Sequence, residues 1–189
     1  MHEIFTPYIM QLQLSVCLNM IVKNEAHIIR RTLEMLCSKI RFDYWVICDT
    51  GSTDATREII QDFFGNRVHI PGELHCDEWV NFAHNRTLAL NRAFGKTDLL
   101  LVFDADDDIR GTIAMPSAVT HDEYHLKFGA PNTGDSTYTR TQLINNRKRF
   151  RYYSVLHEYI SCLEPSPDPH RRVCVLDRLL RGRLVRQLP

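Results

Sequence analysis

The feature that most constrains this chain is an apolar run that ends in a cluster of carboxylates. Residues 99–109 read LLLVFDADDDI, and the acids are Asp104, Asp106, Asp107 and Asp108. Such a run predicts a buried strand, and the strands of open α/β sheets present ligand-binding groups where they end. Carboxylates this close repel one another unless a cation lies between them, and oxygen ligands favour Mg²⁺ or Mn²⁺. The sequence therefore predicts a metal-dependent site.

The first hundred residues alternate between strand and helix patterns. Strands are predicted at 14–22, 44–49, 67–70 and 99–103. Helical periodicity lies between them, at 28–36, 52–64 and 80–94. Gly51 permits a turn before the second helix, with Ser52 or Asp54 as its cap, and Pro71-Gly72 is expected to turn the chain. This alternation predicts an α/β fold with a mostly parallel central sheet covered on both faces.

The pattern changes after Gly111. Three stretches alternate polar with apolar or aromatic residues and have no helix between them: 123–128, 136–145 and 151–160. They predict an added antiparallel portion that forms the other side of a cleft. PSPDP at 165–169 is expected to end the domain. The expected organisation is an N-terminal extension over 1–13, a domain over 14–164, and a Pro-rich connector with an Arg-rich tail over 165–189.

Composition narrows the class of protein. At 189 residues, 44% of them hydrophobic, the chain is long enough for one ordinary globular domain. Lysine plus arginine and aspartate plus glutamate each number 23, so the net charge is zero and we expect no nucleic-acid partner. The six cysteines form no C-x-x-C pair, and the N-terminus lacks the features of a signal peptide or a membrane span. These observations predict a cytoplasmic protein with reduced thiols.

The tail is the exception to this charge balance. Residues 171–189 carry six arginines against the single acid Asp177. Apolar residues fall at helical spacing between them: Leu176, Leu179, Leu180, Leu184 and Leu188. One interpretation is a helix that makes peripheral contact with a membrane surface, and the other is a packing helix with a solvated face. No aromatic platform accompanies the arginines, which argues against a nucleic-acid role.

Three constellations are candidates for chemistry. DTGSTD, at 49–54, suits binding of a polar ligand by backbone N–H groups, although a plain strand-to-helix turn has the same pattern. Strand alternation would place Asp104 and Asp106 on one face, within reach of one metal ion, and the alternative is a solvated acidic loop. His157-Glu158 offers a metal ligand and a general base, and the alternative is an ordinary pair of edge residues.

In order along the chain, SVCLNMIVKNEAHIIRRTLE, VICDTGSTDATREII, WVNFAHNRTLALNRA, LLVFDADDD and LINNRKRFRYYSVLHEYI resemble the motifs of family 2 glycosyltransferases of the GT-A fold. The resemblance covers about residues 14–164. The MIVKNE opening and the VLHEY close are most similar to a subgroup that includes bacterial and viral transferases. The resemblance implies a Rossmann-like fold that binds a nucleotide-diphosphate sugar.

The resemblance also implies roles for matching residues in donor binding. The first strand and the DTGSTD turn hold the nucleotide in such enzymes. Asp49 would then bind the base or the ribose, and Asp54 would support the turn. Arg86, in the HNRTLAL stretch, matches an arginine that approaches the nucleotide.

The remaining matches concern metal binding and catalysis. Asp104 and Asp106 would form the D-x-D pair that holds Mg²⁺ or Mn²⁺ against the diphosphate. His157 would complete the metal site or contact the phosphates. Glu158 would be the catalytic base for inverting transfer of a hexosyl or N-acetylhexosaminyl group to a saccharide, lipid or peptide acceptor.

Two departures from the family leave alternatives open. Ser154 stands where the family often has glycine, and the chain ends soon after the His-Glu pair, so we expect a domain truncated at its C-terminus. A non-catalytic sugar-nucleotide-binding relative is one alternative. Another is a Mg²⁺-dependent phosphatase of the haloacid dehalogenase type, although Asp107 and Asp108 replace the Thr or Val that normally follows its D-x-D.

Overall fold

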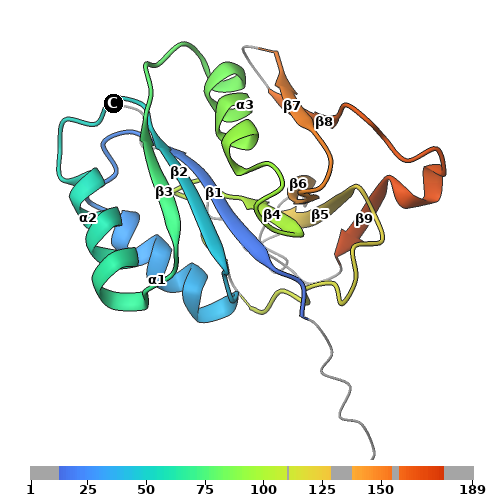
Figure 1. Cartoon of the computed structure of the whole chain (residues 1–189), viewed down its shortest axis with the longest axis horizontal. Helices are drawn as coiled ribbons and strands as arrows, with labels where there is room; N and C mark the ends of the chain where they lie inside the picture. The colour runs from blue at the N-terminus through green and yellow to red at the C-terminus, as the bar shows by residue number, and fades with distance from the viewer. Residues whose placement is uncertain (1–12, 110, 129–137, 155–157, 177–189) are drawn as a thin grey trace, which may run out of the picture.

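The centre of the protein is a seven-stranded sheet with the order β3-β2-β1-β4-β6-β5-β9 (Figure 1). We analysed a computed structural model, which describes residues 13–109, 111–128, 138–154 and 158–176. The strands of this sheet are β1 Val16–Val22, β2 Tyr44–Asp49, β3 Gly72–Cys76, β4 Leu99–Val102, β5 Glu123–Phe128, β6 Tyr138–Asn145 and β9 Val173–Leu176. Its order groups the first four strands at one side.

The sheet is mostly parallel, as predicted. β1 pairs in parallel with both β2 and β4, and β2 pairs in parallel with β3. β6 is antiparallel to its neighbours β4 and β5, while β9 is parallel to β5. The register sets Val22 opposite Asp49 and Asp49 opposite Cys76, so the carboxyl ends of β1, β2 and β3 lie at the same edge. Loops that follow these strands therefore meet there.

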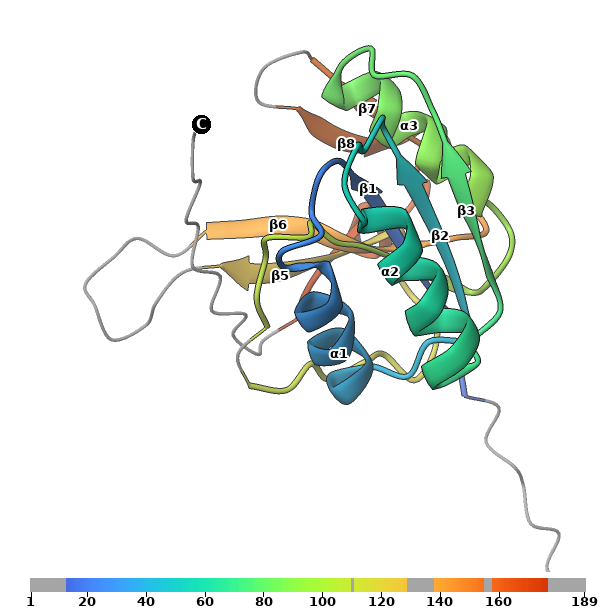
Figure 2. The ribbon, with the colours of Figure 1, turned by 90° about the vertical axis from the view of Figure 1, so that its left-hand side faces the viewer.

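Helices cover both faces of the sheet. α1 (Ile29–Lys39) and α2 (Thr56–Asp62) lie on one face, and α3 (Phe82–Ala93) lies on the other (Figures 1 and 2). Side chains alternate between the two layers, as strand geometry requires. Leu18 belongs to the core beneath α1 and α2, whereas its neighbour Cys17 belongs to the core beneath α3.

The third strand differs from the prediction. Residues 67–70 were expected to form it, but Phe63–Val68 is a π-helical segment (η1) that extends α2, and the strand is β3. Phe64 is buried and stacks on Trp45, with ring centroids 4.3 Å apart. This packing favours a helical conformation over the extended conformation that the β-branched residues Val68 and Ile70 suggest.

The turn predicted at Pro71-Gly72 is also wrong, because Gly72 is the first residue of β3. A Cβ atom at Gly72 would lie 2.3 Å from the Trp45 ring, so only glycine fits against the indole. Trp45 is fixed in this place because its Nε1 donates a hydrogen bond to the Ile70 carbonyl at 2.9 Å. A close approach of backbone to a side chain, and not a turn, explains this glycine.

The predicted strand over 151–160 is two strands. β7 (Phe150–Tyr153) and β8 (Tyr159–Cys162) form an antiparallel pair outside the main sheet. Ser154, which follows β7, has a positive φ of 74°. Phe150 and Tyr152 contribute to the core beneath α3, so this pair of strands covers the same face of the sheet as α3.

Part of the stretch that was expected to be a tail joins the main sheet. A short 3₁₀ helix (η2, Pro169–Arg171) leads into β9, which pairs with β5. Leu176 lies in this strand and not in a helix. The other leucines of the expected tail helix lie outside the described residues, so peripheral membrane contact stays a prediction. Within the described ranges, no helix is long and apolar enough to span a bilayer.

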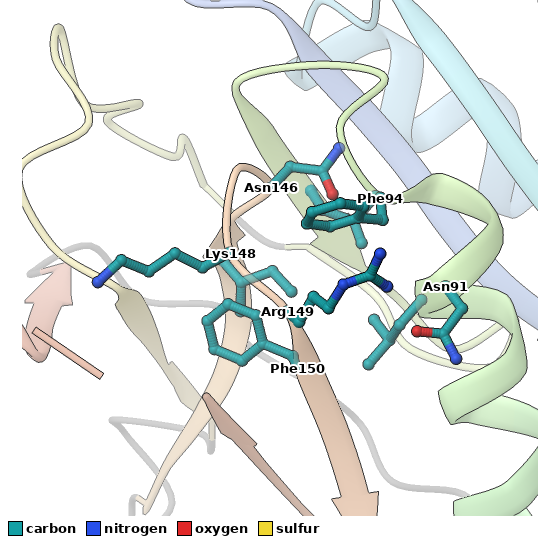
Figure 3. A pocket seen from close by; sticks show the side chains of 9 residues that line it. Asn91, Phe94, Asn146, Lys148, Arg149 and Phe150 are labelled. Carbon is teal, nitrogen blue, oxygen red and sulfur yellow. The ribbon is translucent and has the colours of Figure 1, made fainter. Parts of the chain in front are cut away.

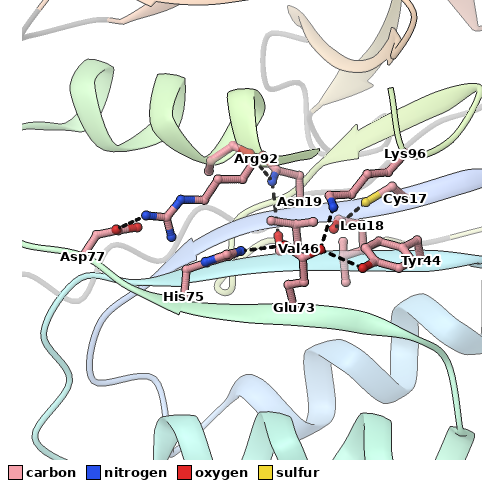
Figure 4. A network of polar contacts seen from close by, with 11 residues as sticks. Cys17, Leu18, Asn19, Tyr44, Val46, Glu73, His75, Asp77, Arg92 and Lys96 are labelled. Atoms are coloured by element: carbon pink, nitrogen blue, oxygen red, sulfur yellow. Dashed lines mark hydrogen bonds and ion pairs between the residues drawn. The ribbon is translucent and has the colours of Figure 1, made fainter. Parts of the chain in front are cut away.

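A polar cluster fastens the edge strand β3 to the α3 side of the sheet (Figure 4). We call it the Glu73 cluster: Tyr44, Glu73, His75 and Lys96. The Glu73 carboxylate accepts hydrogen bonds from Lys96 Nζ at 2.5 Å and from the Tyr44 hydroxyl at 2.8 Å, and His75 Nε2 lies 2.8 Å from its other oxygen. Lys96, followed by Tyr44, lowers the pKa of Glu73 to about 2. The carboxylate is therefore fully paired.

Candidate active site

Functional side chains gather where the parallel strands end. The loops after β1, β2 and β4 lie at this edge, and the N-terminal half of α3 and the residue before β8 come to it from the other face. This is the place at which open α/β sheets bind ligands. Most residues singled out from the sequence lie here.

The loop after β2 is shaped by Asp49. Its Oδ2 accepts hydrogen bonds from the N–H groups of Gly51 at 3.2 Å and Ser52 at 3.0 Å, and Gly51 has a φ of +99°. Its Oδ1 is buried and has no hydrogen-bond partner among the described residues. A buried carboxylate oxygen without a partner is costly, so Asp49 has an acceptor available for a ligand donor such as a hydroxyl or a ring N–H.

Asp54 holds two loops together. Its Oδ2 accepts a hydrogen bond from Ala26 N at 3.1 Å, and its Oδ1 accepts from Thr56 N at 3.0 Å. The bonds from Thr56, followed by that from Ala26, lower the pKa of Asp54. The N-cap of this helix is Ala55, and not Ser52 or Asp54 as expected. Both Asp54 oxygens are occupied, which fits support of the turn better than direct ligand contact.

The acidic residues after β4 do not share a strand face. β4 ends at Val102, and the chain then turns, with Asp107 N donating to the Asp104 carbonyl at 3.2 Å. Asp104 and Asp106 therefore do not lie on one strand face, and the prediction that they would is wrong. Asp104 is half-buried, Asp106 is exposed and Asp107 is buried.

Two arginines converge on Asp104. Arg86 Nη1 lies 2.7 Å from Asp104 Oδ1, and Arg140 Nη2 lies 3.0 Å from Asp104 Oδ2. Arg86 Nε is also 3.4 Å from Glu158 Oε1, and Arg140 Nη1 is 3.4 Å from Asp107 Oδ2. These five residues form what we call the Asp104 cluster. It joins α3, β6, the loop after β4 and the residue before β8.

Arg86 is at the centre of this cluster and is largely desolvated. Its side chain is 10% exposed, and its guanidinium carbon lies 5.8 Å from the centroid of the Phe82 ring and 5.7 Å from that of Tyr152. Burial alone would lower the pKa of Arg86, but Asp104 more than offsets this and raises it. The arginine therefore stays charged and positions both Asp104 and Glu158.

The acids of the site have pKa values that are shifted in opposite directions. Burial would raise the pKa of Asp104, but Arg86 and Arg140 outweigh it and hold that pKa below its usual range. Burial, reinforced by the Asp104 charge, raises the pKa of Asp107 to about 7. Burial and the Asp106 charge likewise raise the pKa of Glu25, which follows β1. Burial is thus the main cause for Asp107 and Glu25, and the neighbouring acids of this edge add to it.

The gathering of acids at this edge is the observation that bears on metal binding. Asp106 is exposed, and none of the hydrogen bonds or ion pairs described within the structure involves its carboxylate. The described residues contain no group of three acids, histidines or cysteines that would hold a metal unaided. Carboxylate oxygens near uncompensated acids suit Mg²⁺ or Mn²⁺ completed by ligand phosphates. The residues present therefore fit a divalent ion bound together with a phosphate-bearing ligand.

Two residues of the site were not predicted from the sequence, and one predicted residue lies outside the described residues. Arg140 could not be found, because only the pairing of β6 with β4 and β5 brings it to Asp104. Glu25 had a signal, since it ends the MIVKNE motif directly after β1. His157 lies outside the described residues, so its expected part in metal or phosphate binding stays a prediction.

A small cavity elsewhere is not part of this site (Figure 3). It has a volume of about 10 Å³, room for about one water molecule. It lies between the C-terminal half of α3 and the turn that joins β6 to β7, where the Arg149 guanidinium covers the Phe94 ring at 4.2 Å. No residue of the Asp104 cluster lines this cavity, and we assign its lining residues a packing role.

Comparisons with known proteins agree with this geometry. Residues 17–159 match the family described as Glycosyl transferase family 2. A comparison with curated proteins gives no significant match. Among solved structures, TarS 1–349 from S. aureus is 15% identical, with a TM-score of 0.56, 88% of this chain covered and 59% of that one.

Two further structures are similar. GalNAc-T7 with UDP, GalNAc and Mn²⁺ is 13% identical, with a TM-score of 0.51, 82% of this chain covered and 31% of that one. The mannosyltransferase PcManGT from Pyrobaculum calidifontis, in complex with GDP-Man and Mn²⁺, is 20% identical, with a TM-score of 0.49 and 60% and 35% covered. This chain thus spans well under two thirds of each of them.

The family match covers most of the chain, and it speaks against the phosphatase alternative. The mostly parallel sheet with its antiparallel part agrees with the fold of TarS 1–349 and GalNAc-T7. The chain therefore belongs to glycosyl transferase family 2 and has the GT-A fold.

Proposed function

We propose that this protein is an inverting glycosyltransferase that moves a sugar from a nucleotide-diphosphate sugar to an acceptor hydroxyl. The observation that carries the proposal is the position of Arg86, which contacts Asp104 at 2.7 Å and Glu158 at 3.4 Å. This contact places an acid of the D-x-D motif and a candidate base on the two sides of one buried guanidinium. A donor diphosphate and an acceptor hydroxyl must meet in such a place.

The nucleotide is assigned to the loops after β1 and β2. The unpaired Oδ1 of Asp49 accepts a hydrogen bond from the base or ribose, while Asp54 keeps the loop in shape. Arg86 is close enough to Asp104 to contribute positive charge near the diphosphate. Family membership supports a nucleotide-sugar donor, and the fold neighbour GalNAc-T7 was solved with UDP and Mn²⁺.

Mg²⁺ or Mn²⁺ is assigned to Asp106, with Asp104 and His157 as the other expected ligands. A divalent cation bound here would stabilise the negative charge of the departing diphosphate. Both oxygens of Asp104 face guanidinium groups, so Asp106 offers the more accessible carboxylate. The neighbouring acids, whose charge adds to the effect of burial on the pKa values of Asp107 and Glu25, support the assignment of a cation to this edge.

Glu158 is assigned as the base. It accepts the proton of the acceptor hydroxyl as that oxygen bonds to the anomeric carbon, and the bond from this carbon to the diphosphate oxygen breaks. Attack from the face opposite the leaving group inverts the configuration. Arg86 Nε lies 3.4 Å from Glu158 Oε1, and this ion pair holds the Glu158 carboxylate at the site.

Calorimetry tests the donor and the metal together. We expect a UDP-sugar or a GDP-sugar to bind at least ten times more tightly with Mn²⁺ than with a chelator. Release of the nucleoside diphosphate, measured with the same donor, then reports transfer to water or to an added acceptor. Manganese-independent binding of every donor would contradict the metal assignment, and tight binding without turnover would favour the non-catalytic alternative.

A further inference from the structure

An exposed apolar patch lies at the N-terminus of α3. We call it the Trp79 patch: Trp79, Val80 and Phe82, which are 42%, 55% and 45% exposed. The Trp79 and Phe82 rings meet edge to face, with centroids 4.8 Å apart. Both rings therefore have free surface, although burying them would stabilise the fold.

The backbone beneath this patch is fixed. Val80 N and Asn81 N donate hydrogen bonds to Asn85 Oδ1 at 2.9 and 3.3 Å, and Asn85 Nδ2 donates to the Glu78 carbonyl at 2.8 Å. Asn85 is 1% exposed, so these bonds are shielded from water. Asn81 also caps α3 by accepting from His84 N at 2.9 Å. The patch is thus presented by a preorganised segment, which lowers the entropy cost of binding.

The patch borders the Asp104 cluster. Phe82 touches Trp79 on one side, and the guanidinium of Arg86 lies 5.8 Å from its ring on the other. The same guanidinium contacts Glu158. A molecule resting on the patch would therefore lie beside the candidate base, where the acceptor of a transfer reaction has to be.

We propose that the Trp79 patch binds a sugar ring of a saccharide acceptor, an inference that rests on the proposed glycosyltransferase function. The C–H face of a pyranose is apolar and matches the face of an aromatic ring, while its rim of hydroxyls needs polar neighbours. Glu78 and His84 are exposed next to the patch and supply them. Preorganised aromatic surface beside polar groups is the pattern of small-ligand recognition.

Size and charge distinguish this occupant from two others. Three exposed side chains are far fewer than the 20 or so per partner of a stable protein interface. The exposed Glu78 precedes the patch, and its charge opposes contact with an anionic membrane. A saccharide is neutral and matches the area of one or two rings.

The two tryptophans of the chain make the patch directly observable. Trp45 is 6% exposed and stacks on Phe64, so a ligand that changes tryptophan emission without unfolding the protein reports Trp79. The experiment titrates cellotriose, maltotriose, mannotriose and chitotriose into the full chain with Mn²⁺ and UDP or GDP. At least one saccharide is expected to shift the emission saturably.

Variants of Trp79 test whether the saccharide binds at the patch. Trp79→Ala is expected to weaken saccharide binding, measured by calorimetry, at least tenfold, and Trp79→Phe less than threefold because it keeps an aromatic face. Val175→Ala on β9, an exposed apolar residue outside the patch, serves as the matched control and should leave binding unchanged. Circular dichroism verifies that each variant is folded.

The other outcomes overturn the proposal. Saccharide binding that Trp79→Ala leaves intact, or no response to any of the four saccharides, would show that the patch is not an acceptor site. Capture of the protein by phosphatidylcholine–phosphatidylglycerol vesicles, lost in Trp79→Ala, would assign the patch to a lipid surface instead. Nucleotide binding with Mn²⁺, measured on the same sample, separates these results from failure of the proposed function itself, which would remove both inferences.

Discussion

Two charged clusters of this protein differ in how their carboxylates are paired, and the pKa of a carboxyl is lowered in one and raised in the other. In the Glu73 cluster one carboxylate faces Lys96, the Tyr44 hydroxyl and His75, and its pKa is lowered to about 2. In the Asp104 cluster, three carboxylates share two arginines, and the pKa of Asp107 is raised to about 7.

The difference distinguishes a cluster that holds the fold together from the one that we propose as the active site. The Glu73 cluster is balanced and a third exposed, so it requires nothing further and serves to hold β3 in place. In the Asp104 cluster the Arg86 and Asp107 side chains are only 10% and 6% exposed, and the acids Asp106 and Glu25 lie nearby. Folding alone does not favour such an arrangement, and perturbed pKa values of this kind mark functional sites.

The largest expected effect is on turnover. Glu158→Gln should lower turnover about 10³-fold or more, because the amide cannot take the acceptor proton, while nucleotide affinity changes little. Nucleoside diphosphate release and calorimetry measure the two quantities. Glu73→Gln in the balanced cluster is the matched control and should keep activity. Transfer at the parent rate by Glu158→Gln would require another base.

Removing the central arginine should destabilise the protein. Arg86→Ala leaves Asp104 and Glu158 short of their common cation and should lower the free energy of unfolding by about 3 to 5 kcal/mol. Urea denaturation, followed by circular dichroism, measures this loss. A loss below about 1 kcal/mol would mean that the site's charges are better solvated than their burial indicates.

The raised pKa of Asp107 makes stability depend on pH. The native state holds a proton up to about pH 7 that the unfolded chain releases near pH 4, so this stabilisation is present at low pH and is lost as pH rises through that window. As pH rises from 5 to 8, the free energy of unfolding of Asp107→Asn should therefore increase by about 3 kcal/mol relative to that of the parent protein. Urea denaturation at both pH values measures the gain. An unchanged difference would contradict the shift.

Metal dependence should follow Asp106. Asp106→Asn is expected to remove most of the increase in donor affinity that Mn²⁺ gives. The expected loss is about 100-fold in affinity, or about 3 kcal/mol in the free energy of binding. Calorimetry with and without a chelator measures it. Asp62→Asn, an acid on α2 that is paired with Arg30, is the control and should retain the full gain. Equal losses in both variants would point to a general effect of charge.

The smallest effect is expected in the balanced cluster. Lys96→Ala removes an ion pair in which both side chains are about one third exposed, so the free energy of unfolding should fall by at most about 1 kcal/mol. The same denaturation assay measures it, and turnover should not change. A loss as large as that of Arg86→Ala would erase the distinction between the two clusters.

Local sequence patterns predicted most of the strands and helices of the first hundred residues. The strands β1, β2 and β4 and the three helices lie within a few residues of their expected positions, because apolar periodicity reports which faces are buried. The third strand was missed because stacking of Phe64 on Trp45 outweighs local β propensity. The register of β7 and β8 and the pairing of β9 also depend on partners far along the chain.

By itself, the sequence determined the alternation of strands and helices, the edge at which Asp49, Asp54, Asp104 and Asp106 meet, and the family. These follow from motifs whose residues are neighbours along the chain. Only the tertiary structure decided that Arg140 shares Asp104 with Arg86, and that Glu158 comes to the same guanidinium. Such contacts join residues 36 to 72 positions apart, and sheet pairing, not local periodicity, sets them.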